Sequence, residues 1–264
     1  MSAVLDRIIR DLRRAGDERE ARGIELVQAL YQDLDLADLI ALLRSATETD
    51  SPLARVKYMD RLMAAWDDAT AYLVEPPQGL ALAVRQALEV GVTGAAEMLA
   101  AQQVVTDAFR VPPTLQLRWM DAAEARMREF WGGEPPRFRQ EIQGALRLGL
   151  ERGQGIDQIV SAMQDRVSVS RSRAVRIART EIANAASYAM RESQVEAGAT
   201  HYIWRTAKDM RVRGRPGGYY EDSRYDHWAR DGKIFAWDKP PPDGHPGQPI
   251  MCRCVALPVL NPAT

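Results

Sequence analysis

Apolar residues recur with the 3.6-residue period of an α-helix through most of the first two hundred positions of this 264-residue chain. The i, i+3, i+4, i+7 spacing is followed by Leu5, Ile8, Ile9 and Leu12, and again by Val56, Met59, Leu62, Met63 and Trp66. Each segment is predicted to be an amphipathic helix that buries one stripe. A chain with this pattern is expected to be mainly α.

Proline and glycine clusters divide the helical region, because proline lacks a backbone donor and blocks the preceding turn. The breaks fall at residues 75–79, 111–113 and 132–136, and they predict helices over 80–109, 115–131 and 137–150. A short helix over 156–166 is expected to end before Ser168 and Ser170. Either serine is a good N-cap for a long helix that stops near Gly198.

The composition changes after Gly198. Alternating residues predict short strands near 202–206, 233–237 and 255–259, separated by glycine and proline loops. We therefore expect a mainly α protein, with a helical N-terminal portion and a small α+β C-terminal module. We predict three parts along the chain: a helical region that binds a partner (1–110), a second helical region that ends in the long helix (111–198) and the small C-terminal module (199–264).

Composition excludes several classes of protein. A hydrophobic content of 46% supports a buried core, and a net charge of -1 excludes a polycation, so any nucleic-acid contact requires a local patch. The first ten residues carry charges that a signal peptide lacks, and no apolar run approaches the roughly 20 residues that span a bilayer. We expect a protein made and assembled in a cytoplasm, without membrane contact.

Ligands suited to zinc are concentrated near the C-terminus. His227, His245, Cys252 and Cys254 supply the four nitrogen and sulfur ligands of a structural site, and alternate residues of an extended segment can reach one ion. A thin, loop-rich core is also where a structural metal is useful. The alternative is a pair of small buried thiols beside a solvated His245 loop.

Arginine is dense along the predicted long helix and just after it. Residues 166–215 hold eleven Lys or Arg against four Asp or Glu. Such a patch can neutralise phosphates without reading sequence, and Arg171, Arg173 and Arg176 are the candidate nucleic-acid contacts. The alternative is that these arginines form a solvated helix face or pair with acidic side chains.

Arg179 and Glu181 lie two positions apart on the long helix, so they cannot face each other. The alanines around them allow close approach of another backbone, and we expect both side chains to clamp the helix to loops of the C-terminal module. No nucleophile, phosphate-binding loop or catalytic triad accompanies Glu181. We therefore predict no catalytic residue and no enzyme.

The same segments resemble the phage minor head proteins of the Mu F type over about residues 137–260. The resemblance rests on Ile177-Ala-Arg179-Thr180-Glu181, Trp204 with Asp209-Met-Arg211-Val-Arg213, His227 before Asp231-Gly232, His245-Pro-Gly and Cys252-Arg-Cys254. The loop between Arg213 and His227 is longer than is usual in the family. Arg179, Glu181, Trp204 and Asp209 are its structural motif residues here.

This resemblance implies a structural component of the virion at the portal vertex of a tailed phage, acting in head morphogenesis. The implied partners are the portal protein, the major capsid protein and packaged DNA, with several copies in each virion. Some relatives carry a C-terminal toxin domain, which we do not expect here.

Two other classes of function remain open. One is a metal-dependent nuclease, in which His227 or His245 activates water beside Asp209 or Asp226. The other is a nonspecific DNA-binding protein that uses the arginine patch. A closed site of two histidines and two cysteines would favour the structural interpretation.

Overall fold

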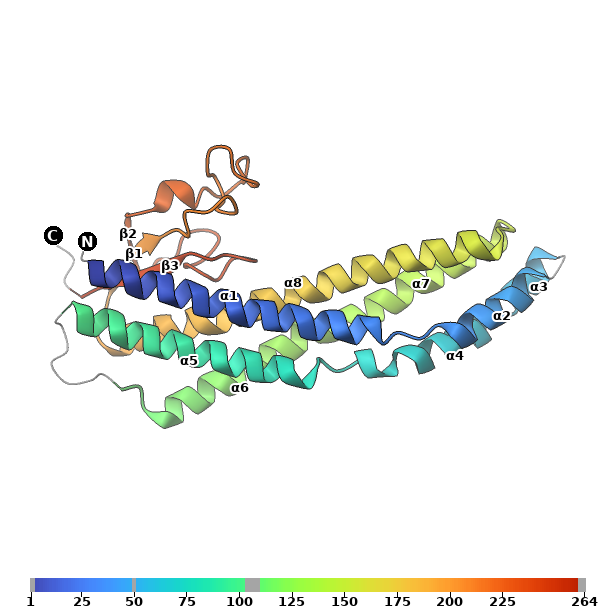
Figure 1. The fold of residues 1–264 in the computed structure, drawn as a ribbon, viewed down its shortest axis with the longest axis horizontal. Helices are drawn as coiled ribbons and strands as arrows, with labels where there is room; N and C mark the ends of the chain where they lie inside the picture. The colour runs from blue at the N-terminus through green and yellow to red at the C-terminus, as the bar shows by residue number, and fades with distance from the viewer. Residues whose placement is uncertain (1–2, 49–50, 103–109, 261–264) are drawn as a thin grey trace. The chain divides into compact units, whose positions relative to one another are not determined.

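The computed structural model describes residues 3–48, 51–102 and 110–260, and in this part of the chain helices precede a small sheet (Figure 1). The helices are α1 (Ala3–Gln32), α2 (Ala37–Thr47), α3 (Pro52–Val56), α4 (Met59–Thr70), α5 (Gln78–Ala101), α6 (Pro113–Gly132), α7 (Glu134–Glu151) and α8 (Ile156–Glu196), with short 3-10 turns η1 (Ala71–Leu73) and η2 (Trp228–Arg230). The strands are β1 (His201–Arg205), β2 (Ile234–Ala236) and β3 (Val255–Val259). The predicted fold class, mainly α with a small α+β C-terminal part, is confirmed.

The chain forms two compact units that interleave along the sequence. Unit 1 comprises Met1–Gly23, Gly79–Arg126 and Ala178–Thr264, and unit 2 comprises Ile24–Gln78 and Met127–Ile177. Helices α1, α6 and α8 each contribute residues to both units. The division into 1–110, 111–198 and 199–264 stays a prediction about functional parts.

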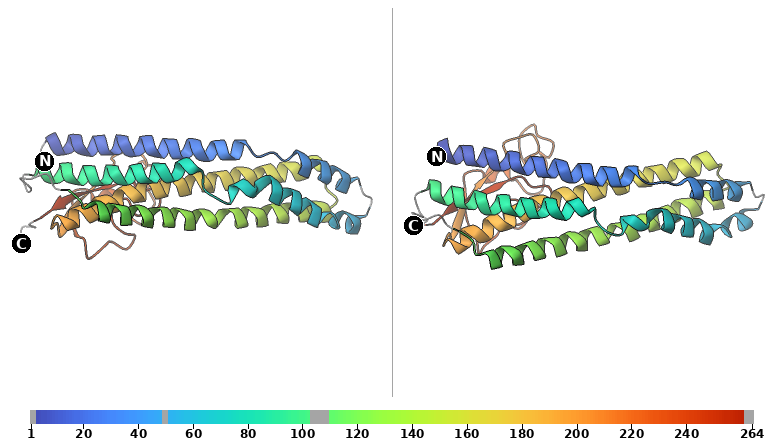
Figure 2. Two further views of the ribbon diagram at one scale, coloured as in Figure 1. Left: turned by 90° about the horizontal axis from the view of Figure 1, so that it is seen from below. Right: turned by 60° about the horizontal axis from the view of Figure 1, so that its bottom comes forward.

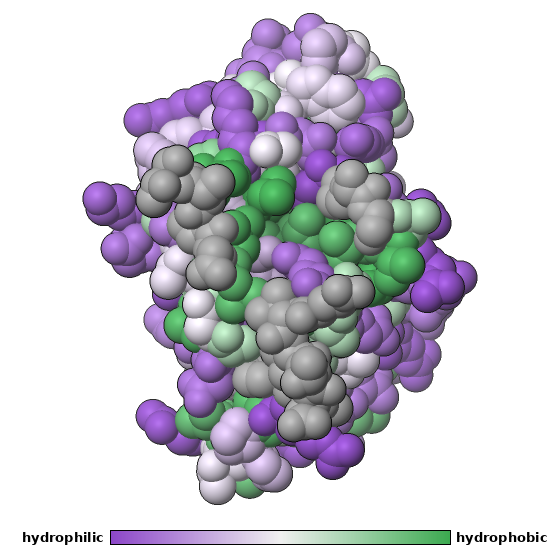
Figure 3. All heavy atoms as spheres, turned by 90° about the vertical axis from the view of Figure 1, so that its left-hand side faces the viewer, coloured by the Kyte–Doolittle hydropathy of each residue, from purple (hydrophilic) through white to green (hydrophobic). Residues whose placement is uncertain are grey.

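Unit 1 packs the first part of α1, helix α5 and the last part of α8 side by side (Figure 2). Their apolar core consists of Leu5, Ile8, Ile9, Ala95, Met98, Met190 and Leu257. Two glycines let α5 approach its neighbours closely, since a Cβ on Gly91 would lie 2.1 Å from the carbonyl oxygen of Ala186 and one on Gly94 would lie 2.3 Å from a methyl group of Leu12. Figure 3, which views the molecule from the left-hand side of Figure 1, shows apolar residues on that surface.

The sheet of unit 1 is antiparallel, with strand order β2-β1-β3. Tyr202 pairs with Phe235 on one side and Pro258 on the other. Because strand residues alternate between faces, Tyr202 and Trp204 point together into a second core with Trp237, Cys252, Cys254 and Ala256. All three predicted strands are confirmed.

Unit 2 contains α2, α3, α4 and α7, together with parts of α1, α6 and α8. Its core is built on aromatic rings: Phe138 packs edge-on against Trp66 with ring centroids 4.8 Å apart, and the ring of Tyr31 lies 6.1 Å from that of Phe138. The buried indole N–H of Trp131 donates to the carbonyl oxygen of Leu73 over 2.9 Å. These contacts use the apolar stripe that the spacing of Met59, Leu62, Met63 and Trp66 predicts.

One predicted helix boundary is wrong. Helix α8 runs without a break from Ile156 to Glu196, so neither Ser168 nor Ser170 is an N-cap. Serine can stay inside a helix when its hydroxyl finds another partner, and that of Ser170 bonds to Tyr31 and Glu134. The predicted stop is confirmed, because Gly198 adopts the left-handed φ of 89° that ends many helices.

Proline positions account for the other helix boundaries. Pro135 and Pro136 occupy the first turn of α7, where a missing N–H costs nothing, so this helix begins three residues before the predicted start. The helix predicted over 80–109 corresponds to α5, and its predicted end at Phe109 lies outside the described residues. Among the described helices, none combines the length and apolarity needed to cross a bilayer.

Candidate metal centre

Three side chains of unit 1 converge at the end of the sheet. His227 directly precedes η2, and Cys252 and Cys254 lead into β3. The Nδ1 atom of His227 lies 3.6 Å from the sulfur of Cys252 and 3.7 Å from the sulfur of Cys254. All three side chains are buried, and their ligand atoms lie within 4.8 Å of one another.

These distances fit a tetrahedral ion. Zinc bonds of about 2.0 to 2.3 Å at tetrahedral angles place a nitrogen and a sulfur ligand about 3.5 Å apart. The backbone N–H of Gly247 also points at the sulfur of Cys252, over 3.4 Å. The donor set therefore suits zinc, as the alternation of Cys252 and Cys254 predicts.

Asp243 orients the imidazole of His227. Its Oδ2 atom lies 2.7 Å from Nε2 of His227, and its Oδ1 atom accepts a bond of 2.7 Å from Arg230. Burial alone would raise the pKa of Asp243, but the hydrogen bonds from His227 and Arg230 outweigh it and lower the pKa. An ionised carboxylate only accepts hydrogen bonds, so Nε2 carries the proton and Nδ1 presents its lone pair to the sulfurs.

The two thiols share a proton unequally. The pKa of Cys252 is lowered far below its usual value because Cys254 hydrogen-bonds to its sulfur. The pKa of Cys254 is raised by the same hydrogen bond and by burial. A thiolate at Cys252 is the form in which cysteine binds a metal.

The structure places His245, the fourth predicted ligand, outside this group. Its Nδ1 atom lies 3.0 Å from the hydroxyl of Tyr202, and its ring packs edge-on against Trp237. Burial, with a smaller effect of Arg191, lowers the pKa of His245 to about 4. His245 is thus a neutral, buried residue of the aromatic core, and a closed site of two histidines and two cysteines is not formed.

Arg253, between the two cysteines, ties this segment to the rest of unit 1. Its guanidinium lies 2.5 Å from Asp17 of α1 and also pairs with Asp209. Neither Arg253 nor Asp243 is assigned a role by the sequence pattern. The signal for Arg253 is the same alternation that directs the cysteines inward, since it turns the residue between them to the opposite side.

The expected clamp between Arg179, Glu181 and the C-terminal loops is wrong. Arg179 pairs with Glu20 of α1 over 3.2 Å, and Glu181 pairs with Arg126 of α6 over 2.7 Å. Two residues at positions i and i+2 point to different sides of a helix, and here both sides face other helices. Helix α8 instead meets the C-terminal module at Gly247, where a Cβ would lie 1.7 Å from the Ser187 hydroxyl.

The remaining motif residues have structural surroundings. Trp204 is fully buried between His227, whose ring centroid is 5.1 Å away, and the guanidinium of Arg230. Asp209 accepts from the backbone N–H of Arg211 besides pairing with Arg253. In the described residues neither Asp209 nor Asp226 joins the group that could hold a metal.

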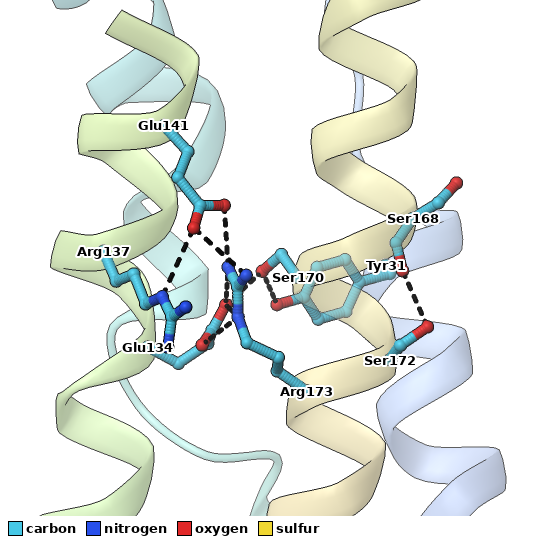
Figure 4. Close-up of polar contacts among 8 residues, drawn as sticks. All are labelled: Tyr31, Glu134, Arg137, Glu141, Ser168, Ser170, Ser172 and Arg173. Atoms are coloured by element: carbon cyan, nitrogen blue, oxygen red, sulfur yellow. Dashed lines mark hydrogen bonds and ion pairs between the residues drawn. The ribbon is translucent and has the colours of Figure 1, made fainter. Parts of the chain in front are cut away.

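The three candidate arginines for nucleic acid differ in their surroundings. Arg173 points from α8 between the carboxylates of Glu134 and Glu141 of α7, at 2.8 and 2.9 Å, and its side chain is 13% exposed (Figure 4). Its charge is therefore neutralised inside unit 2. Arg171 and Arg176 are exposed and keep their candidate role.

Together these features define a mainly α protein with a small antiparallel sheet that carries a buried imidazole–dithiol centre. Residues 140–257 match the family model of Phage Mu protein F like protein, which confirms the resemblance to Mu F-like phage head proteins. A Haemophilus influenzae protein, described as an uncharacterized protein, is 29% identical over 125 residues. The match covers 47% of this chain and only 26% of that protein. No solved structure matches the chain.

Proposed function

We propose that the chain is a structural minor head protein of a tailed phage, located in the virion at the portal vertex and acting in head morphogenesis. The match of residues 140–257 to Phage Mu protein F like protein carries this proposal. The portal protein and the major capsid protein are the proposed partners, in several copies per virion, with DNA as a further contact.

The surroundings of the motif residues support a structural role. Arg179, Glu181, Asp209 and Arg253 all make ion pairs inside unit 1. Catalysis requires an acid, base or nucleophile with access to substrate, whereas each of these groups is engaged by an oppositely charged side chain. We therefore propose assembly without turnover.

The test is to copurify the chain with portal protein and to incubate it separately with DNA and divalent metals. We expect cosedimentation with portal rings and no DNA cleavage. Arg179→Ala should reduce incorporation into heads, because it leaves Glu20 partly buried and unpaired, while the exposed Arg14→Ala serves as a matched control. Metal-dependent cleavage that His227→Ala abolishes, with no portal association, would establish the nuclease instead.

We further infer that His227, Cys252 and Cys254 hold a structural zinc ion. The donor set and its 3.6 and 3.7 Å separations support this, as does the carboxylate behind the imidazole. Cys252 and Cys254 also line a cavity of about 80 Å³, which has room for a water molecule beside the two sulfurs. Elemental analysis of protein purified without chelator should find near-stoichiometric zinc, and a metal-free, fully folded protein would contradict the inference.

A further inference from the structure

A second cavity of unit 1, distinct from the metal centre, is lined mainly by basic side chains. It has a volume of about 260 Å³ and lies where the first turns of α1 meet the end of β1. Its lining consists of Asp6, Ile9, Arg10, Arg13, Arg205, Thr206 and Lys208. A single water molecule fills about 30 Å³, so the cavity has room for a hydrated polyatomic ion.

Positive charge in this cavity exceeds negative charge. Four cations face one lining carboxylate, that of Asp6. Among the described residues, Arg10 and Arg205 make no ion pair, and Lys208 reaches Asp231 only at 3.7 Å. Like charges gathered in a hollow with few counter-charges create a field that attracts anions.

Arg13 also lines the cavity, and one of its hydrogen-bond donors has no partner. One of its terminal nitrogens donates to the carbonyl oxygen of Thr206, but its buried Nε has no hydrogen-bond partner. Burial lowers the pKa of Arg13, and the nearby charges of Arg205 and Arg253 lower it further, against Cys254 and Asp231. A buried donor without a partner is costly, and an anion in the cavity would offset the charge of the Arg13 guanidinium.

The backbone at the rim is also unusual. Lys208 has a φ of 57°, in the left-handed region that residues other than glycine, asparagine and aspartate rarely adopt. Such conformations persist where surrounding contacts impose them, and they concentrate at binding sites. Lys208 lines the cavity together with Arg10, Arg13 and Arg205.

We propose that this cavity binds a phosphate group. The several guanidinium donors match the oxygens of a tetrahedral dianion, which arginine recognises through paired hydrogen bonds. The group could belong to a small phosphate compound or to the backbone of a nucleic acid, since both present the same oxygens. The site itself goes beyond the proposed head function, and only its nucleic-acid source bears on the DNA contact proposed there.

The experiment titrates the full-length protein with inorganic phosphate by calorimetry at low ionic strength, and with duplex DNA of unrelated sequences by fluorescence anisotropy. Arg10→Gln and Lys208→Gly are the test variants, because both side chains are exposed and glycine relieves the strain at φ 57°. Arg14→Gln is the control, since it removes the same charge from an exposed position of α1 outside the cavity.

If small phosphates are the ligands, each test variant should weaken phosphate binding at least fivefold and leave DNA affinity unchanged. If a nucleic-acid backbone is the ligand, the same variants should weaken DNA binding equally for all sequences and reduce its salt dependence by about one ion per removed contact. Unchanged melting temperatures and an unaffected Arg14→Gln protein accompany either result. No binding of phosphate or DNA, or equal losses in Arg14→Gln, would overturn the proposal.

Discussion

Asp243 and His227 meet at 2.7 Å between Oδ2 and Nε2, and this contact directs the other ring nitrogen toward Cys252 and Cys254. The carboxylate is itself held by Arg230, so the imidazole has both its tautomer and its orientation set before any ion arrives. In the proposed zinc site the two cysteines would supply the soft ligands, and Asp243 would orient the histidine.

Asp243→Asn should weaken zinc binding 10- to 100-fold, because the amide no longer holds the imidazole as a charged acceptor does. Competition with a chromogenic chelator measures the affinity. Asp238→Asn, at an exposed position of the same segment, should bind as the parent does. Equal affinity in the Asp243→Asn protein would show that the contact does not serve a metal.

Gly91→Ala should destabilise the protein by about 2 kcal/mol or more, although alanine normally stabilises a helix relative to glycine. The added Cβ would lie 2.1 Å from the carbonyl oxygen of Ala186, and a backbone atom cannot move aside cheaply. Gly16→Ala, on α1 of the same unit, meets nothing within 4 Å and should be stabilising. Denaturant unfolding of both variants checks the pair, and a stable Gly91→Ala protein would exclude this close helix packing.

Arg173→Met should reduce the free energy of unfolding by about 3 kcal/mol, because it leaves the buried carboxylate of Glu134 without its partner. Adding Glu134→Gln to Arg173→Met should recover part of the loss, since the uncompensated charge is then gone. Arg171→Met, at an exposed position two residues away, should change stability by less than about 0.5 kcal/mol. Chemical denaturation of the three variants tests this, and a neutral Arg173→Met would contradict the inferred network.

Arg171→Gln combined with Arg176→Gln should weaken nonspecific DNA binding equally for all sequences and flatten its salt dependence. These two side chains are exposed, whereas a variant that also changes Arg173 would lose stability as well as charge. Anisotropy titrations at several salt concentrations make the measurement. DNA binding equal to that of the parent would identify the arginines as a solvated helix face.

His245 should make the protein less stable in mild acid. Its pKa is about 4 when folded and about 6.5 when unfolded, so the unfolded state takes up a proton first as pH falls. The free energy of unfolding is therefore unaffected by the titration of His245 above pH 6.5 and falls between pH 6.5 and 4, with a loss of about 1 to 2 kcal/mol at pH 5. His245→Gln should remove this part of the pH dependence in thermal melts at pH 7 and 5, and an unchanged slope would contradict it.

Local patterns in the sequence determined most of the helices, the strands and three of the four predicted members of the candidate metal centre. The spacing of Leu5, Ile8 and Ile9 predicts a buried stripe, and the alternation of Cys252 and Cys254 directs both sulfurs to one side, because these periods follow from backbone geometry alone. Gly198 ends α8 as predicted, since its left-handed φ is a local preference.

Contacts between distant residues were decided only by the tertiary structure. Ser170 stays inside a continuous helix because Tyr31 and Glu134 engage its hydroxyl, and Arg179 finds its carboxylate on α1, 159 positions earlier. His245 joins an aromatic core and Asp243 takes the place beside His227, although both lie in one loop. Local sequence sets which groups are available, whereas pairing depends on how helices and strands far apart in the chain pack.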